Sequence, residues 1–143
     1  MKLSDIMSSP VVTCGPDDTL RVVSDIFKRT QFHHILVTEQ NVLTGVVSDR
    51  DFLKAISPNV GKASATPADR ATLNKRVSQV MSHSPISLTT QAKLIDVVTL
   101  FNQHRISCVP IIDEQRAPVG IITWRDVMRI MLEKYQLKQK PTS

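Results

Sequence analysis

Hydrophobic and polar positions follow the same succession of spacings in both halves of the chain. In the first half, Leu20, Val23 and Phe27 recur at helical spacing, which predicts an amphipathic helix over residues 19–30. The flanking residues predict extended segments or strands at 11–14, 34–37 and 43–47, and a second helix that opens at 48–51. The second half predicts strands at 86–89, 109–112 and 119–123, and helices at 94–104 and from 124 onwards. Each half therefore has the order strand, helix, strand, strand, helix.

The two halves also match residue by residue. Leu3–Phe27 aligns without a gap on Val77–Phe101, which lies 74 positions later. The second half then gains one residue, and Asp51 aligns with Asp126 at an offset of 75. The period is too long, and two copies are too few, for a solenoid. The pattern predicts an α/β (α+β) fold of two βαββα repeats, with ligand sites where the copies meet.

The repeat also suggests where the parts of the chain begin and end. We expect repeat 1 at 1–56, a linker at 57–73, repeat 2 at 74–134, and the last helix end with a tail at 135–143. The linker is assigned from its prolines, its glycine and its small polar residues. A unit of roughly 60 to 70 residues buries a limited core, so each repeat should be stabilised by the other.

Composition narrows the class of protein. With 41% apolar and 22% charged residues, the chain is typical of a folded globular protein. No apolar run is long enough for a membrane span and the N-terminus does not resemble a signal peptide, so a cytoplasmic protein is expected. Cys14 and Cys108 lie at unmatched positions, which favours small buried thiols over a disulfide, a metal site or a nucleophile.

The formal net charge of +5 raises the question of an anionic partner. Much of the excess lies in the last helix and tail, which a solvated helix face explains most simply. A basic face for anionic ligands is the alternative. Aromatic residues are only 4% of the chain and no nucleic-acid-binding motif accompanies the charge, so nucleic-acid binding is a weak third hypothesis.

A hydroxyl residue followed three positions later by aspartate opens the last helix of each repeat. Ser48 and Asp51 form this pattern in the first repeat, and Thr123 and Asp126 form it in the second. The pattern is typical of a helix capping box. The same geometry exposes N–H donors to a phosphate or a ribose, so capping and ligand contact are both open.

The order of elements, the Met-Ser pair before the first strand and the segment Gly120–Asp126 together resemble the CBS (cystathionine β-synthase) domain. The tandem resembles a free-standing CBS pair, or Bateman module, over nearly the whole chain. The resemblance implies two repeats packed through their sheets with pseudo-twofold symmetry. It also implies clefts that bind an adenine nucleotide such as AMP, ADP, ATP or S-adenosylmethionine, and a homodimer through helices, to which the apolar stripe Val127–Met131 would contribute.

The resemblance further implies which residues contact the nucleotide. In relatives, the aspartate of the hydroxyl–aspartate pattern accepts hydrogen bonds from ribose hydroxyls. Basic residues ahead of the second strand face the phosphate, and His33 and His34 occupy these positions here. Copy two has Ser107 and Cys108 there, so the clefts are expected to be unequal. The full set of expected nucleotide-binding residues is Thr13, His33, His34, Ile35, Ser48, Arg50, Asp51, Ser87, Ser107, Val109, Pro110, Thr123, Arg125 and Asp126.

These residues favour a sensor over an enzyme. No nucleophile is paired with a base, no glycine-rich phosphate loop is present and no metal-ligand spacing appears, so neither catalysis, a metal nor a required cofactor is predicted. The leading hypothesis is a regulatory module that binds an adenine nucleotide and transmits its occupancy to a regulated partner such as an enzyme or a transporter. The alternative is a structural or interaction module whose clefts bind no nucleotide.

Overall fold

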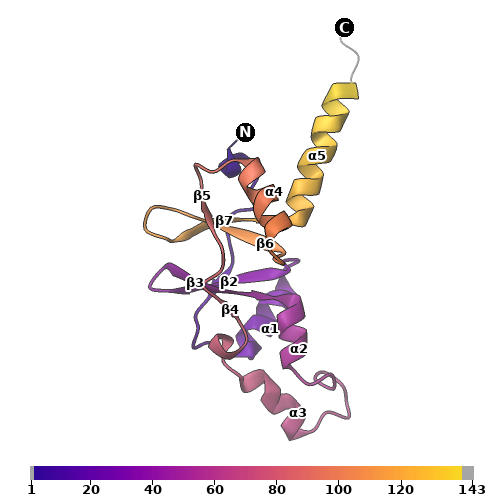
Figure 1. Cartoon of the computed structure of the whole chain (residues 1–143). Coiled ribbons are helices and arrows are strands. Elements are labelled where there is room, and N and C mark those ends of the chain that lie inside the picture. The colour runs from indigo at the N-terminus through magenta and orange to yellow at the C-terminus, as the bar shows by residue number, and fades with distance from the viewer. Residues whose placement is uncertain (1, 140–143) are drawn as a thin grey trace. The chain divides into compact units, whose positions relative to one another are not determined.

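The computed structural model describes residues 2–139, which form two compact units (Figure 1). We call Val12–Pro85 the first unit, and Met1–Val11 together with Ile86–Ser143 the second unit. The predicted mixed α/β fold with the repeated order β, α, β, β, α is confirmed in both units. The first unit contains β1 (Thr13–Cys14), α1 (Leu20–Arg29), β2 (His34–Glu39), β3 (Val42–Ser48), α2 (Asp49–Ala55), α3 (Pro67–Ala71), η2 (Thr72–Asn74), η3 (Val77–Gln79) and β4 (Ser82–His83). The second contains η1 (Leu3–Asp5), β5 (Leu88–Thr89), α4 (Leu94–Gln103), β6 (Cys108–Ile112), β7 (Pro118–Thr123) and α5 (Trp124–Gln139).

Each unit is built around one sheet. In the first unit the strand order is β1-β2-β3-β4, with β1 parallel to β2 and the other pairs antiparallel. In the second unit the order is β5-β6-β7, with β5 parallel to β6 and β7 antiparallel to it. The β2–β3 hairpin turns at Gln40 and Asn41, both of which have positive φ. Such a turn matches the twist of the paired strands, as the polar residues at this place predict.

The segment that leads each repeat lies in the unit formed by the other repeat. Val77 of the second repeat is fully buried in the core of the first unit, while its counterpart Leu3 is fully buried in the core of the second. The backbone pairing is equally matched, because Ser82 pairs with Val46 and Ser8 pairs with Ile121. The two compact units therefore do not coincide with the two sequence repeats. Each unit is completed by the leading segment of the other repeat.

In each sheet, a glycine leaves room for the leading segment of the other repeat. A Cβ added at Gly45 would collide with the Met81 side chain and lie 3.0 Å from the Ser82 carbonyl oxygen. A Cβ at Gly120 would collide with Met7 in the same way. Each glycine therefore packs against a segment of the other repeat. Glycine stands inside both strands because another segment approaches the backbone closely.

The segment predicted as a linker contains helical structure. Helix α3 begins after Thr66, whose hydroxyl accepts the Asp69 N–H at 3.1 Å while the Asp69 carboxylate accepts the Thr66 N–H at 2.9 Å. Pro67 occupies the first turn, where its missing N–H costs nothing. This capping box is not predicted when the prolines of the segment are interpreted only as helix breakers. At the other end of the chain, α5 extends to Gln139, and the last part of the predicted tail, 140–143, lies outside the described residues.

We predict that Gly45→Ala lowers the free energy of unfolding by about 1–3 kcal/mol, because the added methyl group overpacks the contact with the Met81 segment. Urea denaturation would measure the change. Gly15→Ala is the matched control, since a Cβ at Gly15 meets its nearest neighbour, a side-chain oxygen of Asp18, at an ordinary 3.6 Å. Equal stability of both variants would contradict the role assigned to the glycine.

Candidate functional site

Four predicted site residues of the first unit lie together where β2 begins and β3 ends. The antiparallel register places His34 directly opposite Ser48. The hairpin continues one step further, because the Asp49 N–H donates to the His33 carbonyl oxygen at 2.9 Å. Since Asp51 follows Ser48 within the first turn of α2, His33, His34, Ser48 and Asp51 form one polar cluster. This cluster is the first-repeat candidate site.

Ser48 and Asp51 cap helix α2 reciprocally. The Asp51 N–H donates to Ser48 Oγ at 3.0 Å, and the Ser48 N–H donates to Asp51 Oδ2 at 3.1 Å. The predicted capping box is therefore confirmed in this repeat. Capping occupies only one oxygen of the carboxylate. The other oxygen, Oδ1, takes no hydrogen bond from residues 2–139 and is available to a hydroxyl group of a ligand.

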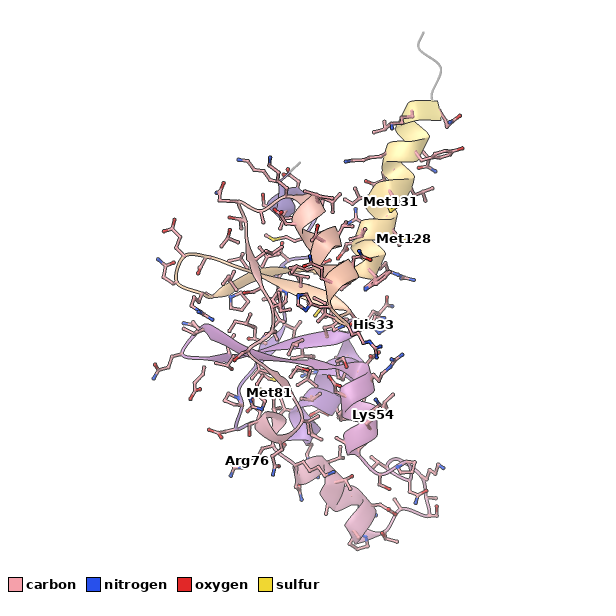
Figure 2. All side chains as sticks on the ribbon, viewed as in Figure 1. His33, Lys54, Arg76, Met81, Met128 and Met131 are labelled. Carbon is pink, nitrogen blue, oxygen red and sulfur yellow. The ribbon has the colours of Figure 1, made fainter. Side chains whose placement is uncertain are left out.

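The two histidines have different environments. His33 is exposed (Figure 2), and its Nδ1 lies 2.8 Å from Asp49 Oδ2. Partial desolvation would raise the pKa of Asp49, but the hydrogen bond from His33, the Arg50 N–H and the nearby imidazoles outweigh it and lower that pKa. His34 is half-buried, and burial lowers its pKa, opposed by the charges of Asp49 and Asp51. His33 is thus the more accessible of the two histidines.

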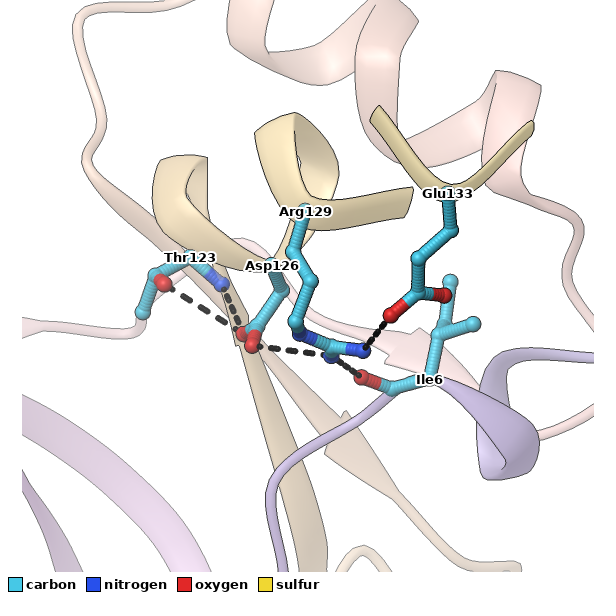
Figure 3. Close-up of polar contacts among 5 residues, drawn as sticks. All are labelled: Ile6, Thr123, Asp126, Arg129 and Glu133. Atoms are coloured by element: carbon cyan, nitrogen blue, oxygen red, sulfur yellow. Dashed lines mark hydrogen bonds and ion pairs between the residues drawn. The ribbon is translucent and has the colours of Figure 1, made fainter. Parts of the chain in front are cut away.

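The corresponding cluster of the second unit is more closed (Figure 3). Asp126 is only 8% exposed, and its Oδ2 accepts the Thr123 N–H at 2.9 Å and the Thr123 hydroxyl at 3.3 Å. The predicted capping is present only in part, since the hydroxyl donates to the carboxylate instead of accepting a backbone N–H. Arg129 Nη2 donates to the other carboxylate oxygen, Asp126 Oδ1, at 3.5 Å. It also donates to the Ile6 carbonyl oxygen at 3.4 Å.

A tryptophan replaces the histidine–aspartate pair in the second unit. Trp124, at the position of Asp49, donates from Nε1 to the Ile106 carbonyl oxygen at 3.2 Å and packs on Phe101 with ring centroids 5.5 Å apart. Ser107 is exposed and Cys108 is buried opposite Thr123. The two candidate sites therefore share the hydroxyl–aspartate pair and differ at the positions of His33, His34 and Asp49.

The other predicted site residues occupy varied positions. Ile35 and Val109 are fully buried in the two cores, so their side chains pack there. Arg50 and Arg125 are exposed on the first turns of α2 and α5. For the remaining three, contact with a ligand stays a prediction: Thr13 is exposed in β1, Ser87 is half-buried just before β5, and Pro110 is buried in the middle of β6.

Two contacts in these clusters were not predicted from the sequence. The pairing of His33 with Asp49 could have been found from the hairpin, because residues that flank a predicted β-pair on both strands must be neighbours. The bridge from Arg129 to Ile6 had no signal in the local sequence, because the two residues belong to segments 123 positions apart.

Several predictions about chemistry can be compared with the described residues. Cys14 and Cys108 are buried, as predicted, and burial raises the pKa of Cys14 to about 12, with a smaller contribution from the charge of Asp18. Within residues 2–139 no group of three or more His, Cys, Asp and Glu side chains could hold a metal ion. None of the described helices has the length and apolar character needed to cross a membrane.

The chain belongs to the CBS domain family. The sequence profile of the CBS domain matches residues 3–58 and 77–133, which are the two repeats. The CBS domain-containing protein YhcV of Bacillus subtilis is 31% identical over 87% of this chain and 81% of its own. The uncharacterized protein MJ0188 of Methanocaldococcus jannaschii is also 31% identical over 94% of this chain, and this chain spans only 45% of that protein.

The fold is that of a CBS domain pair. The crystal structure of the CBS domain pair of protein MJ0100, in complex with 5′-methylthioadenosine and S-adenosyl-L-methionine, has a TM-score of 0.77. It covers 94% of this chain and 98% of its own at 22% identity. The family and fold class predicted from the sequence are therefore confirmed.

We predict that His34 makes the fold sensitive to mild acid. Its pKa in the folded chain lies below the ordinary 6.5, so the unfolded chain binds a proton first and stability falls as the pH falls through that range. His34→Gln should lose less stability than wild type between pH 7.5 and 5.5 in urea titrations. His104→Gln, at an exposed position, should follow the wild-type profile. Identical pH profiles for all three proteins would contradict the assignment.

Proposed function

We propose that this chain is a non-catalytic regulatory module that binds an adenine nucleotide and transmits its occupancy to a partner. The observation that carries the proposal is the repeated hydroxyl–aspartate pair, Ser48 with Asp51 and Thr123 with Asp126, at a strand-to-helix junction in each unit. A carboxylate oriented by a backbone N–H can accept hydrogen bonds from the vicinal hydroxyls of a ribose. No required cofactor is part of the proposal.

The class of ligand is supported by the MJ0100 domain pair, which was crystallised with two adenosyl compounds. We assign the phosphate end to His33, whose exposed imidazole can donate a hydrogen bond to an anion. Regulation requires that the ligand bind two states of the module with different affinity. We assign the regulated partner to the class of enzymes or transporters, because the chain itself has the features of a sensor only.

A second function, an interaction module without a nucleotide, is favoured by one observation in the second unit. Arg129 already neutralises Asp126 and connects it to the Ile6 backbone, as a purely structural cap would. If the same description held for Asp51, neither repeat would bind a ligand. The open oxygen of Asp51 argues for the nucleotide in the first repeat.

We predict that isothermal titration calorimetry detects AMP, ADP, ATP or S-adenosylmethionine at submillimolar concentration, and that Asp51→Ala weakens binding about tenfold or more. The loss of a hydrogen bond to a charged acceptor has this magnitude. Asp25→Ala, on the exposed face of α1, is the control for a lost carboxylate, and should bind as wild type does. Circular dichroism would confirm that both variants are folded.

Absence of binding by every one of these compounds below millimolar concentration would refute the sensor and favour the interaction module. If both Asp51→Ala and Asp126→Ala bind the nucleotide as wild type does, the sensor function holds but the assignment of its site residues is wrong.

We also propose that the module is a homodimer that forms through its helices. The repeat places an exposed apolar side chain at the same position of both units, Leu53 at 65% exposure and Met128 at 61%. On α5 the apolar face continues through Met131, Leu132 and Tyr135 along a helix that runs on beyond α4 (Figures 1 and 2). Such a face is self-complementary about a twofold axis.

For this proposal, light scattering should give the mass of two chains at micromolar concentration. Met128→Glu should shift the mass toward one chain, because the new charge would be buried at the apolar contact. Lys134→Glu, an equally exposed change on α5, should leave the dimer intact. A monomeric wild-type protein would overturn the proposal.

A further inference from the structure

Helix α5 extends well past the part of it that packs on its own unit. Its equivalent in the first repeat, α2, ends at Ala55, whose matching residue is Ile130. Ile130 is the last buried residue of α5, and every residue from 131 to 139 is exposed (Figure 1). This stretch, which we call the outer part of α5, therefore has no counterpart in the first repeat, and none of its residues is even half-buried.

One side of the outer part is apolar. Met131, Leu132 and Tyr135 are exposed and lie within one stripe, because residues three and four apart are neighbours on a helix (Figure 2 labels Met131). Together with Met128 they follow the spacing of a helix that pairs with another helix, with Met128 at a, Met131 at d and Tyr135 at the next a. We call Met131, Leu132 and Tyr135 the outer face. Residues without tertiary packing add little to helix stability, so an apolar stripe here indicates a partner that covers it.

The charges beside the outer face are positive. Lys134 stands at the g position next to Tyr135, and Lys138 stands at the following d position. Neither lysine forms an ion pair with residues 2–139. Glu133 is the only acid in the outer part, and its Oε1 already accepts a hydrogen bond from Arg129 Nη1 at 3.4 Å (Figure 3). The outer face therefore borders two cations whose charge the described residues leave unbalanced.

These charges distinguish between the possible occupants. A second copy would bring only the same two lysines to the charged edge of the face. The dimer proposed above is anchored at the matched pair Leu53 and Met128, which precede the outer part, so its contact does not require the outer face. A nucleic acid would neutralise the lysines but leave the apolar side chains in water. A helix with apolar residues at a and d and acidic residues at e and g matches both the apolar face and the cations.

We propose that the outer face of α5 binds an acidic amphipathic helix of the regulated partner. The proposal rests on the proposed function and deepens it, because it names the chemistry by which the module is joined to the protein that it regulates. Met131, Leu132 and Tyr135 pack against the apolar side of the partner helix. Lys134 and Lys138 pair with its carboxylates, and such pairs at the edge of an interface select the partner.

The test uses the full chain and a synthetic peptide of about three heptads, with leucine at a and d and glutamate at e and g. The same peptide with lysine at e and g is the comparison. We expect calorimetry to detect binding of the acidic peptide and not of the basic one. Met131→Ser should weaken the acidic peptide about tenfold, because apolar surface is lost from the contact. Leu137→Ser, a similarly exposed change on the opposite side of α5, is the matched control and should bind as wild type does.

A variant that carries both Lys134→Glu and Lys138→Glu tests the charges. It should weaken the acidic peptide about tenfold and should bind the basic peptide in its place. Light scattering should give this variant the same mass as wild type, which excludes a changed oligomer as the cause.

No binding of the acidic peptide, equal affinity for the two peptides, or an equal loss in Met131→Ser and Leu137→Ser would overturn the docking surface. Tighter binding of duplex DNA or of phosphatidylserine vesicles than of the acidic peptide would also overturn it. Release of single chains when the peptide binds would assign the face to a second copy instead.

These outcomes are separate from the nucleotide titration, because none of the changed residues lies in a candidate site. Failure of the peptide to bind leaves the nucleotide sensor unaffected. If the peptide binds as expected and no nucleotide binds, the docking surface holds and the chain is the interaction module.

Discussion

The close approach of a methionine-bearing segment to a glycine-bearing strand is the constraint on which the rest of the structure depends. Met81 lies over Gly45 in the first unit, and Met7 lies over Gly120 in the second. Any larger residue at either glycine would force the segments apart. Because each segment leads the opposite repeat, each core is completed by residues of the other repeat.

The leading segments also bring together the side chains around the two candidate sites. They bring Gln79 and Val80 against helix α2, and they bring Ile6 within reach of Arg129. At matching positions, Lys54 lines a pocket beside Asp51, whereas Arg129 pairs with Asp126. Two copies of one scaffold can therefore differ in ligand binding without any change in fold, because side-chain length and charge act on the same backbone frame.

Much of the fold could be predicted because its signals are local. Helical spacing at Leu20, Val23 and Phe27 and the polar turn before Val42 depend only on neighbours in the chain. The capping box at Ser48 was equally readable. The site was predictable only in part. Its hydroxyl–aspartate pairs repeat in the sequence, whereas Lys75 and Gln79 have no sequence feature that connects them to Asp51.

The amino-acid sequence by itself determined the repeat, the order of strands and helices, the family, and the inequality of the two sites at His33 and Ser107. Only the tertiary structure decided which leading segment completes which core. It also decided which aspartate is paired with an arginine and which is not. The physical reason is distance along the chain. Hydrophobic period and capping act over a few residues, while the contacts of Met7 with Gly120 and of Ile6 with Arg129 join residues more than a hundred positions apart.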